Sequence, residues 1–221
     1  MEYVHDYLII GGGMAGDAAA KAIHEADGLA NVGLVGAEAD APYARPPLSK
    51  ALWKESRPAE SVDLGTAASG ASLHLGRRVV ALDRVAHVAT DDHGDTYRYR
   101  KLLLATGVSP RRLAFAGSER IIHFRTRADY QKLRALAEPG AIIAVIGGGF
   151  IGAELAAALA GAGCEVTMIF PDAHIGAGRY PVGLTEFLDG YYREHGVDVR
   201  PGLTVTGAEP TDGGVELKLS S

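Results

Sequence analysis

The sequence predicts an α/β protein built from two parallel β-α-β units, and three observations support this prediction. Residues 141–170 contain an apolar run, a glycine-rich turn, a helical stretch and a second apolar run, in that order. Residues 7–35 repeat the same order of segments. Between the two regions, short apolar runs alternate with turn residues, which is typical of β-strands. Since a strand, a helix and another strand in succession indicate a parallel sheet, each region predicts one such unit.

The later region contains a G-x-G-x-x-G turn between a strand at Ala141–Ile146 and a helix at Phe150–Ala162, and a strand at Glu165–Phe170 follows. In this motif the first glycine tightens the turn, the second lets the backbone approach a pyrophosphate, and the third lets helix and strand pack closely. Free N–H groups at the helix N-terminus attract phosphate. We therefore predict a Rossmann-like dinucleotide site at Gly147, Gly149, Phe150, Ile151 and Gly152.

The earlier region repeats the motif between a strand at Tyr7–Ile10 and a helix at Ala15–Ala26, with the next strand at Val32–Val35. An acidic side chain about 20 positions after the glycines commonly binds a ribose hydroxyl, and Glu38 stands there. A solvated loop carboxylate is the alternative interpretation of Glu38. The predicted residues of this site are Gly11, Gly13, Met14, Ala15, Gly16 and Glu38.

A proline-rich stretch at residues 42–53 follows the first unit. Arg45 and Lys50 would place two cations close to the first phosphate site, and Ser49 could cap a short helix. From composition alone, this stretch is a loop with a solvated basic pair.

The middle of the chain predicts strands followed by a linker. Four short strands, at residues 72–75, 77–82, 85–90 and 96–100, predict a β-meander inserted into the first unit. The run Leu102–Gly107 predicts a buried parallel strand, whose carboxyl end is a usual place for ligands. Pro110–Gly117 predicts the linker, so we expect domains at residues 1–113 and 114–221.

The segments after the linker complete the second domain. Thr126 is expected to cap a helix that extends to Ala137, because threonine accepts hydrogen bonds from free backbone N–H groups there. A further helix at Leu184–His195 and strands at residues 197–200, 203–208 and 215–219 follow.

Composition excludes several classes of function. A net charge of −5 does not suggest nucleic acid or an anionic membrane as partner, and no apolar run reaches the ~18 residues of a membrane span. The single cysteine, Cys164, cannot form an internal disulfide or a Cys-x-x-C redox pair, and a cytoplasmic location is expected. The histidines lack metal-ligand spacing, so no metal site is expected. No serine stands in a G-x-S-x-G elbow, so a hydrolase is not expected.

The motifs GGGMAG and PYARPPLSKALW, with Glu38 between them, resemble the FAD-dependent pyridine nucleotide-disulfide oxidoreductase superfamily. The resemblance is to its group of ferredoxin reductase, putidaredoxin reductase and apoptosis-inducing factor. It implies that the first glycine motif binds FAD and that Lys50 lies near the flavin N5. Further FAD contacts implied by the resemblance are Arg45, the Val80 backbone, Ala105, Thr106, Gly107 and Arg111.

For the second glycine motif, the resemblance implies NAD(P)H. Glu154 matches a glutamate near the nicotinamide that pairs with the lysine, so a Lys50–Glu154 pair would bridge the two domains as the catalytic pair. Asp172, after Phe-Pro, would bond the adenosine ribose and repel a 2′-phosphate, which favours NADH over NADPH. Nearby His174 and Arg179 could instead accommodate that phosphate.

The expected function is that of an FAD-dependent NAD(P)H oxidoreductase. Hydride would pass from NADH to FAD, and electrons would then go to a ferredoxin-like protein, a quinone or another acceptor. Because the resemblance covers only the N-terminal half of a family member, the C-terminal part of the family fold is expected to be absent. The alternatives are a non-catalytic nucleotide-binding or regulatory module, and one half of a split reductase. A homodimer, or a partner chain that supplies the missing half, is then expected.

Overall fold

A computed structural model describes residues 1–54, 58–115 and 118–220. The chain forms two compact units. The first unit comprises Met1–Arg45 and Glu60–Ser109, and the second comprises Pro46–Ala59 and Pro110–Ser221. Residues 116 and 117 of the expected linker lie outside the described residues.

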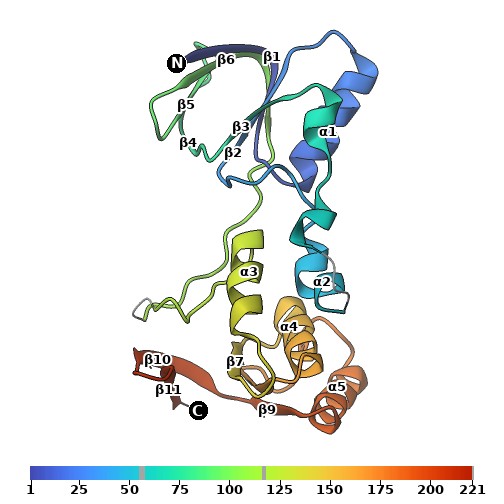
Figure 1. The fold of residues 1–221 in the computed structure, drawn as a ribbon, viewed down its shortest axis with the longest axis vertical. Helices are drawn as coiled ribbons and strands as arrows, with labels where there is room; N and C mark the ends of the chain where they lie inside the picture. Colours follow the sequence, from blue (N-terminus) through green and yellow to red (C-terminus); the bar gives the residue numbers. More distant parts are fainter. Residues whose placement is uncertain (55–57, 116–117, 221) are drawn as a thin grey trace. The chain divides into compact units, whose positions relative to one another are not determined.

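The first unit is built on a six-stranded sheet with the order β3-β2-β1-β6-β5-β4. β1 pairs in parallel with β2 on one side and with β6 on the other, and β3 is parallel to β2. β4, β5 and β6 are antiparallel to one another in turn (Figure 1). The strands are β1 (Glu2–Ile10), β2 (Val32–Gly36), β3 (Ser72–Leu75), β4 (Val79–Asp83), β5 (Val88–Asp91) and β6 (Thr96–Leu104).

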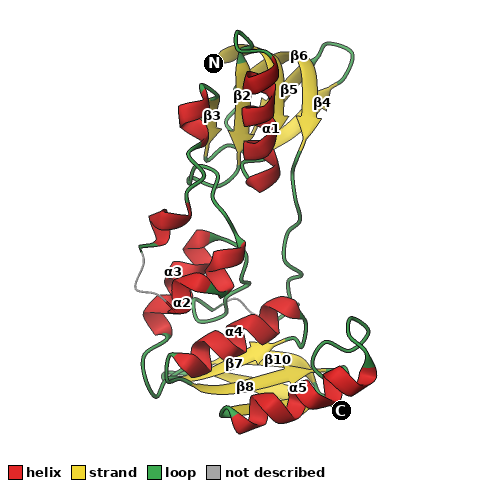
Figure 2. Cartoon of the chain, turned by 90° about the vertical axis from the view of Figure 1, so that its right-hand side faces the viewer, coloured by secondary structure: helices red, strands yellow, loops and turns green. Residues whose placement is uncertain are grey.

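Both faces of this sheet are buried at its centre, which explains the continuous apolar runs in the sequence. Helix α1 (Met14–Ala26) lies across one face (Figure 2). Its Ala20 joins a core cluster with Ile9 and Leu34. On the opposite face, Leu8 packs with Tyr97 in a second cluster. Alternate residues of β1 therefore fill two separate cores.

Three expectations about the middle strands are wrong. Residues 72–75 do not belong to the meander, because β3 pairs in parallel with β2 at the other edge of the sheet. The strands expected at residues 96–100 and 102–107 form one strand, since β6 pairs with β1 from Thr96 to Leu104. Leu103 and Leu104 are 42% and 59% exposed, so the described residues leave the carboxyl end of β6 partly uncovered rather than buried.

A pair of histidines crosses the sheet of the first unit. The Nε2 atoms of His5 on β1 and His74 on β3 are 3.2 Å apart, and His5 Nδ1 lies 3.0 Å from Asn31 Oδ1. Gly33 on the intervening β2 makes room for this contact, because a Cβ there would lie 2.4 Å from the His5 ring. Two facing ring nitrogens form a hydrogen bond only when one of them lacks a proton.

The second unit has a three-stranded parallel sheet with the order β7-β8-β9 and a separate hairpin. Helix α4 lies along one side of the sheet (Figure 2), and its Leu155 and Leu159 pack on Met168 and Val199. The elements are α3 (Arg127–Leu136), β7 (Ile142–Ile146), α4 (Phe150–Gly161), β8 (Glu165–Phe170), α5 (Val182–Glu194), β9 (Val197–Pro201), β10 (Thr204–Pro210) and β11 (Val215–Ser220).

The predicted cap of α3 is confirmed and forms a complete capping box. Asp129 N–H donates to the Thr126 hydroxyl, and Thr126 N–H donates to the Asp129 carboxylate at 2.8 Å. Such a cap contributes about 1 kcal/mol to the stability of a helix.

Short helical turns carry the segments between the larger elements. They are the 3-10 turns η1 (Pro46–Ser49), η2 (Ala59–Val62) and η3 (Thr66–Ser69), and the short helix α2 (Ala51–Lys54). In the described part of the chain, no helix combines the length and the apolar character needed to span a membrane.

Candidate functional site

The first glycine turn connects the carboxyl end of β1 to α1, and its geometry admits only glycine at two positions. Gly11 has φ +133°, and a Cβ there would lie 2.0 Å from the Ala105 carbonyl oxygen. A Cβ on Gly16 would lie 2.1 Å from the Gly11 oxygen. Since Cβ atoms never approach this closely, both glycines are required for the turn. Gly13 precedes the helix without a side-chain cap, which leaves its first N–H groups available.

Arg45 lies beside this turn and is held by two neighbours. Its Nη2 atom is 3.9 Å from the position of a Cβ on Gly13. The guanidinium donates to the Glu38 carboxylate and, at 3.0 Å, to the Tyr43 hydroxyl. Tyr43 in turn donates to Glu38 at 2.5 Å. Burial lowers the pKa of Arg45, but the hydrogen bond with Glu38 and the nearby negative charge outweigh it and raise the pKa.

The structure thus joins two residues that the sequence predicted separately, Glu38 as a ribose ligand and Arg45 as a phosphate ligand. A carboxylate has about four acceptor positions, so Glu38 keeps capacity for a ribose hydroxyl beside Tyr43 and Arg45.

The remaining predicted FAD contacts differ in their position relative to the first glycine turn and in their exposure. Ala105 follows β6 and meets the first turn directly, since its N–H donates to Ile10 at 2.8 Å. Gly107 has a left-handed backbone with φ +67°. Val80 lies on β4, which β5 separates from β6, and it is 62% exposed. The other predicted contacts, Met14, Ala15, Thr106 and Arg111, are also exposed.

The second glycine turn repeats the positive φ of the first glycine and the close contact of the third glycine. Gly147 has φ +121°, and a Cβ on Gly152 would lie 2.0 Å from the Gly147 oxygen. Gly149 precedes α4 without a side-chain cap. Gly148 packs on the Phe170 ring, where a Cβ would approach to 2.8 Å. The turn therefore presents free N–H groups at the start of a helix in both units.

The loop of residues 171–181 is fastened over the second turn. Gly176 N–H donates to the Gly148 oxygen at 2.8 Å. Asp189 of α5, which is buried, accepts from Ile175 N–H at 2.9 Å and lies 2.9 Å from His174 Nδ1. Asp172, the predicted ribose ligand, is exposed at the start of this loop.

Lys50 and Glu154, the predicted catalytic pair, form an ion pair with 2.9 Å between Nζ and Oε1. The Ser49 hydroxyl donates to the other carboxylate oxygen, Oε2, at 2.6 Å. The expectation that Ser49 caps the short helix is wrong, because Ser49 ends η1 and Lys50 separates it from α2, which begins at Ala51. The expectation that the pair bridges two domains is also wrong, since both residues belong to the second compact unit.

Packing within the second unit sets the position of the turn that carries Ser49 and Lys50. Leu48 and Leu52 are buried, and Trp53 Nε1 donates to the Leu48 oxygen at 2.8 Å. Tyr130 of α3 donates from its hydroxyl to the Leu52 oxygen at 3.1 Å. These contacts fix the turn that presents Ser49 to α4.

Tyr192 of α5 is a neighbour of this site that sequence reasoning missed. Its hydroxyl donates to the Ala153 oxygen at 3.0 Å. Burial, and then the negative charge of Glu154, raise the pKa of Tyr192. The only signal in the sequence is that Tyr192 follows Leu188 by one helical turn on the apolar side of α5.

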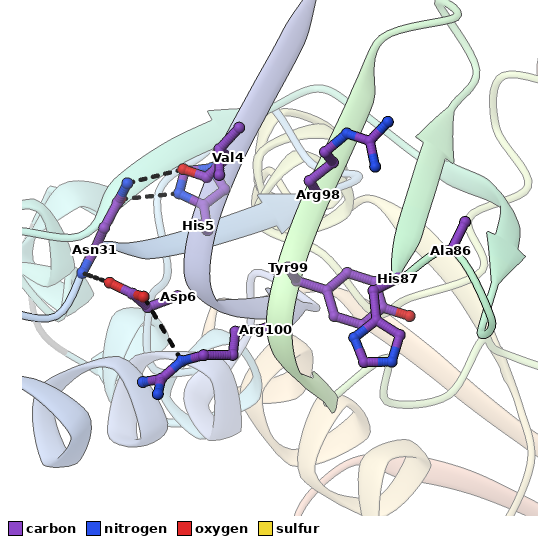
Figure 3. Close-up of a pocket in the computed structure, with 9 residues that line it drawn as sticks. All are labelled: Val4, His5, Asp6, Asn31, Ala86, His87, Arg98, Tyr99 and Arg100. Atoms are coloured by element: carbon purple, nitrogen blue, oxygen red, sulfur yellow. Dashed lines mark hydrogen bonds and ion pairs between the residues drawn. The ribbon is translucent and has the colours of Figure 1, made fainter.

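A cavity of about 360 Å³ lies elsewhere in the first unit, along the N-terminal halves of β1 and β6 (Figure 3). Its charged side chains are paired: Arg100 lies 3.7 Å from Asp6, and Arg98 lies 2.6 Å from Glu2. The lining residues are Val4, His5, Asp6, Asn31, Ala86, His87, Arg98, Tyr99 and Arg100. It contains no residue of the predicted sites.

The described residues contain no group of His, Cys, Asp and Glu that could hold a metal ion. Cys164 is buried, and burial raises the pKa of its thiol.

Residues 5–221 match the family described as pyridine nucleotide-disulphide oxidoreductase. The ferredoxin–NAD(+) reductase component of a p-cumate 2,3-dioxygenase system from Pseudomonas putida is 36% identical over 99% of this chain and 55% of its own length. The corresponding component of an anthranilate 1,2-dioxygenase system from Burkholderia cepacia is 38% identical over 86% of this chain and 48% of its own length. The chain thus spans about half the length of these relatives.

Solved structures give the same picture. A covalent complex of putidaredoxin reductase and putidaredoxin matches with a TM-score of 0.89 and 30% identity, over 97% of this chain and 54% of the other. A water-forming NADH oxidase from Lactobacillus brevis, bound to NADH, matches with a TM-score of 0.87 and 26% identity, over 97% of this chain and 50% of the other.

Proposed function

Because this chain belongs to the pyridine nucleotide-disulphide oxidoreductase family, we propose that it acts in an FAD-dependent NAD(P)H oxidoreductase that delivers electrons to a ferredoxin-type protein. Two glycine turns of matching geometry support two dinucleotide sites, one for flavin and one for nicotinamide. Relatives that are ferredoxin reductase components support the choice of acceptor.

The observation that carries the proposal is the cluster of Ser49, Lys50 and Glu154 beside the second glycine turn. Glu154 stands two residues after Gly152, and its carboxylate orients the lysine ammonium at 2.9 Å. A site that only bound nucleotide would need phosphate and ribose ligands, which the turns already offer. A lysine held in place by a carboxylate adds a fixed positive charge, which is the kind of group that stabilises developing negative charge.

In this proposal the first unit holds FAD. Backbone N–H groups of the turn at Gly11, Gly13, Met14, Ala15 and Gly16 would bind its pyrophosphate, and Glu38 would bind its ribose. Arg45, with Ala105, Thr106 and Gly107, would complete the contacts next to the turn. Val80 and Arg111 remain proposed contacts on the strength of the resemblance.

The second unit would hold the nicotinamide dinucleotide at Gly147, Gly149, Phe150, Ile151 and Gly152. FAD, when bound, accepts hydride from the nicotinamide and passes electrons on. Lys50 would donate hydrogen bonds and supply positive charge, while Glu154 and Ser49 keep its ammonium oriented. We also propose a cytoplasmic location.

We propose NADH as the preferred donor, because Asp172 would accept hydrogen bonds from a ribose 2′-hydroxyl and repel a 2′-phosphate. Asp172→Asn should lower the ratio of the NADPH dissociation constant to the NADH dissociation constant, both measured by titration calorimetry. An unchanged ratio would remove Asp172 from the specificity argument.

Flavin reduction tests the catalytic cluster directly. In stopped-flow experiments under anaerobic conditions, Lys50→Ala should slow reduction by NADH about tenfold or more, while the NADH dissociation constant changes little; tenfold corresponds to about 1.4 kcal/mol in the barrier. Lys54→Ala, at an exposed lysine of the short helix α2 that follows Lys50, is the matched control and should reduce at the wild-type rate. Equal rates for wild type and Lys50→Ala would refute the role of the lysine.

The alternative is a nucleotide-binding or regulatory module without turnover, or one half of a split reductase. A steady-state assay with NADH and ferricyanide separates the possibilities. Sustained turnover supports the oxidoreductase, whereas nucleotide binding without turnover supports the module. Turnover that appears only after a second polypeptide is added supports the split enzyme.

A further inference from the structure

Arg179 lies over the second glycine turn. A Cβ on Gly149 would be 3.6 Å from the guanidinium carbon of Arg179, and that carbon is 5.9 Å from the centre of the Phe150 ring. Tyr180 meets Phe150 edge-on, with 5.6 Å between ring centres. The aromatic face thus supports the guanidinium beside the first residues of α4.

The first turn has an arginine in the equivalent place. Arg45 lies 3.9 Å from the position of a Cβ on Gly13, and both Gly13 and Gly149 directly precede their helix. Each arginine also follows its glycine at a similar interval, 32 positions in the first unit (45 − 13) and 30 in the second (179 − 149). The two units therefore share the position of a cation as well as the glycine spacing.

The two arginines differ in their partners. Arg45 is neutralised by Glu38 and bonded to Tyr43. Over residues 1–54, 58–115 and 118–220, Arg179 has no carboxylate within ion-pair distance. An exposed arginine with no ion pair, next to the free N–H groups of a helix N-terminus, is a strong donor for an anion.

The backbone that carries Arg179 is held in place. Gly176 N–H donates to the Gly148 oxygen of the turn at 2.8 Å, and Arg179 N–H donates to the Gly176 oxygen at 2.9 Å. The buried Asp189 fixes Ile175 on the other side. The guanidinium is therefore presented to the turn by a fastened loop.

We infer that Arg179 contacts the pyrophosphate of the dinucleotide at the second turn, as the counterpart of Arg45 at the first. This inference rests on the proposed function, because it assumes a nicotinamide dinucleotide there. Planar guanidinium matches two phosphate oxygens at once, which a lysine cannot do. Arg179 is a binding and positioning residue, and it would recognise a group that NADH and NADPH share.

Titration calorimetry of the whole chain with NADH and NADPH tests this inference. Arg179→Gln should weaken the binding of both dinucleotides by about the same factor, on the order of tenfold, and Arg179→Lys should lie between this variant and wild type. Arg120→Gln, at an exposed arginine of the same unit, is the control and should bind as wild type does. Unchanged circular dichroism and melting temperature would show that the variants fold.

Three results would overturn the inference, and each is distinct. If Arg179→Gln binds NADH as wild type does but loses NADPH, the arginine reads the 2′-phosphate and not the pyrophosphate. If it binds both as wild type does, Arg179 has no part in the site. If the wild-type chain itself binds neither dinucleotide, the proposed function fails together with the inference.

Discussion

The ion pair of Lys50 and Glu154 allows a quantitative prediction about stability. Glu154→Gln removes the negative charge but keeps an acceptor for Ser49. Since Lys50 is 53% and Glu154 24% exposed, solvent weakens the pair, and the free energy of unfolding should fall by only about 0.5–1 kcal/mol.

Glu154→Ala should have a larger effect. The Ser49 hydroxyl, in a residue that is 3% exposed, would lose the acceptor that now lies 2.6 Å away. An unsatisfied buried hydroxyl costs about 1–3 kcal/mol, which adds to the lost ion pair. The order wild type, Glu154→Gln, Glu154→Ala in decreasing stability therefore follows from the geometry.

Urea unfolding, followed by circular dichroism, measures these differences. A double-mutant cycle of Lys50→Met with Glu154→Gln should give a coupling free energy of about 0.5–1 kcal/mol. The same cycle with Lys54→Met is the control, since Lys54 is exposed on the short helix α2 that follows Lys50, and it should give no coupling. Zero coupling for Lys50, or equal destabilisation by Glu154→Gln and Glu154→Ala, would refute this reasoning.

Three further predictions concern stability. Gly16→Ala should lower the free energy of unfolding of the first unit by several kcal/mol, because the new Cβ would lie 2.1 Å from the Gly11 oxygen. A variant that unfolds at the same urea concentration as wild type would contradict this. Thr126→Ala should lower the free energy of unfolding by about 1 kcal/mol, and Thr126→Ser should restore it, if the capping box acts as described. Acid should destabilise the first unit. Burial, and then the neighbouring His5, lower the pKa of His74, so the unfolded chain binds the proton more tightly. The contribution of neutral His74 to stability is then fully present above about pH 6.5, the ordinary pKa of histidine. It declines as the pH falls toward the pKa of His74 in the folded protein. His74→Gln should reduce the change in urea midpoint between pH 7.5 and 5.5. If the midpoint of the variant changes with pH as much as that of wild type, His74 is not the cause of the acid destabilisation.

The sequence predicted the parts of the fold that local pattern determines. Strand, turn and helix at each glycine motif are confirmed, because the glycine spacing and the apolar runs are features of neighbouring residues. The cap at Thr126 is confirmed for the same reason. The partner of β3 and the unbroken course of β6 could not be predicted, because strand pairing depends on residues far apart in the chain.

The site shows the same division. The glycine turns were predicted from the residues, and the pairing of Lys50 with Glu154 came from the resemblance to a family. The bond from Ser49 to Glu154 joins residues 105 positions apart, and no local pattern indicates it. The sequence alone allows Arg179 to accommodate a 2′-phosphate. In the structure Arg179 lies over the glycine turn, because the 171–181 loop folds back onto Gly148.

The visible absorption spectrum of the purified chain, before and after anaerobic addition of NADH, tests the central claim most directly. The proposal predicts a flavin spectrum that bleaches when NADH is added, because both dinucleotide sites would be present and connected by hydride transfer. A colourless protein that takes up no added FAD would contradict the claim that this chain alone holds the flavin.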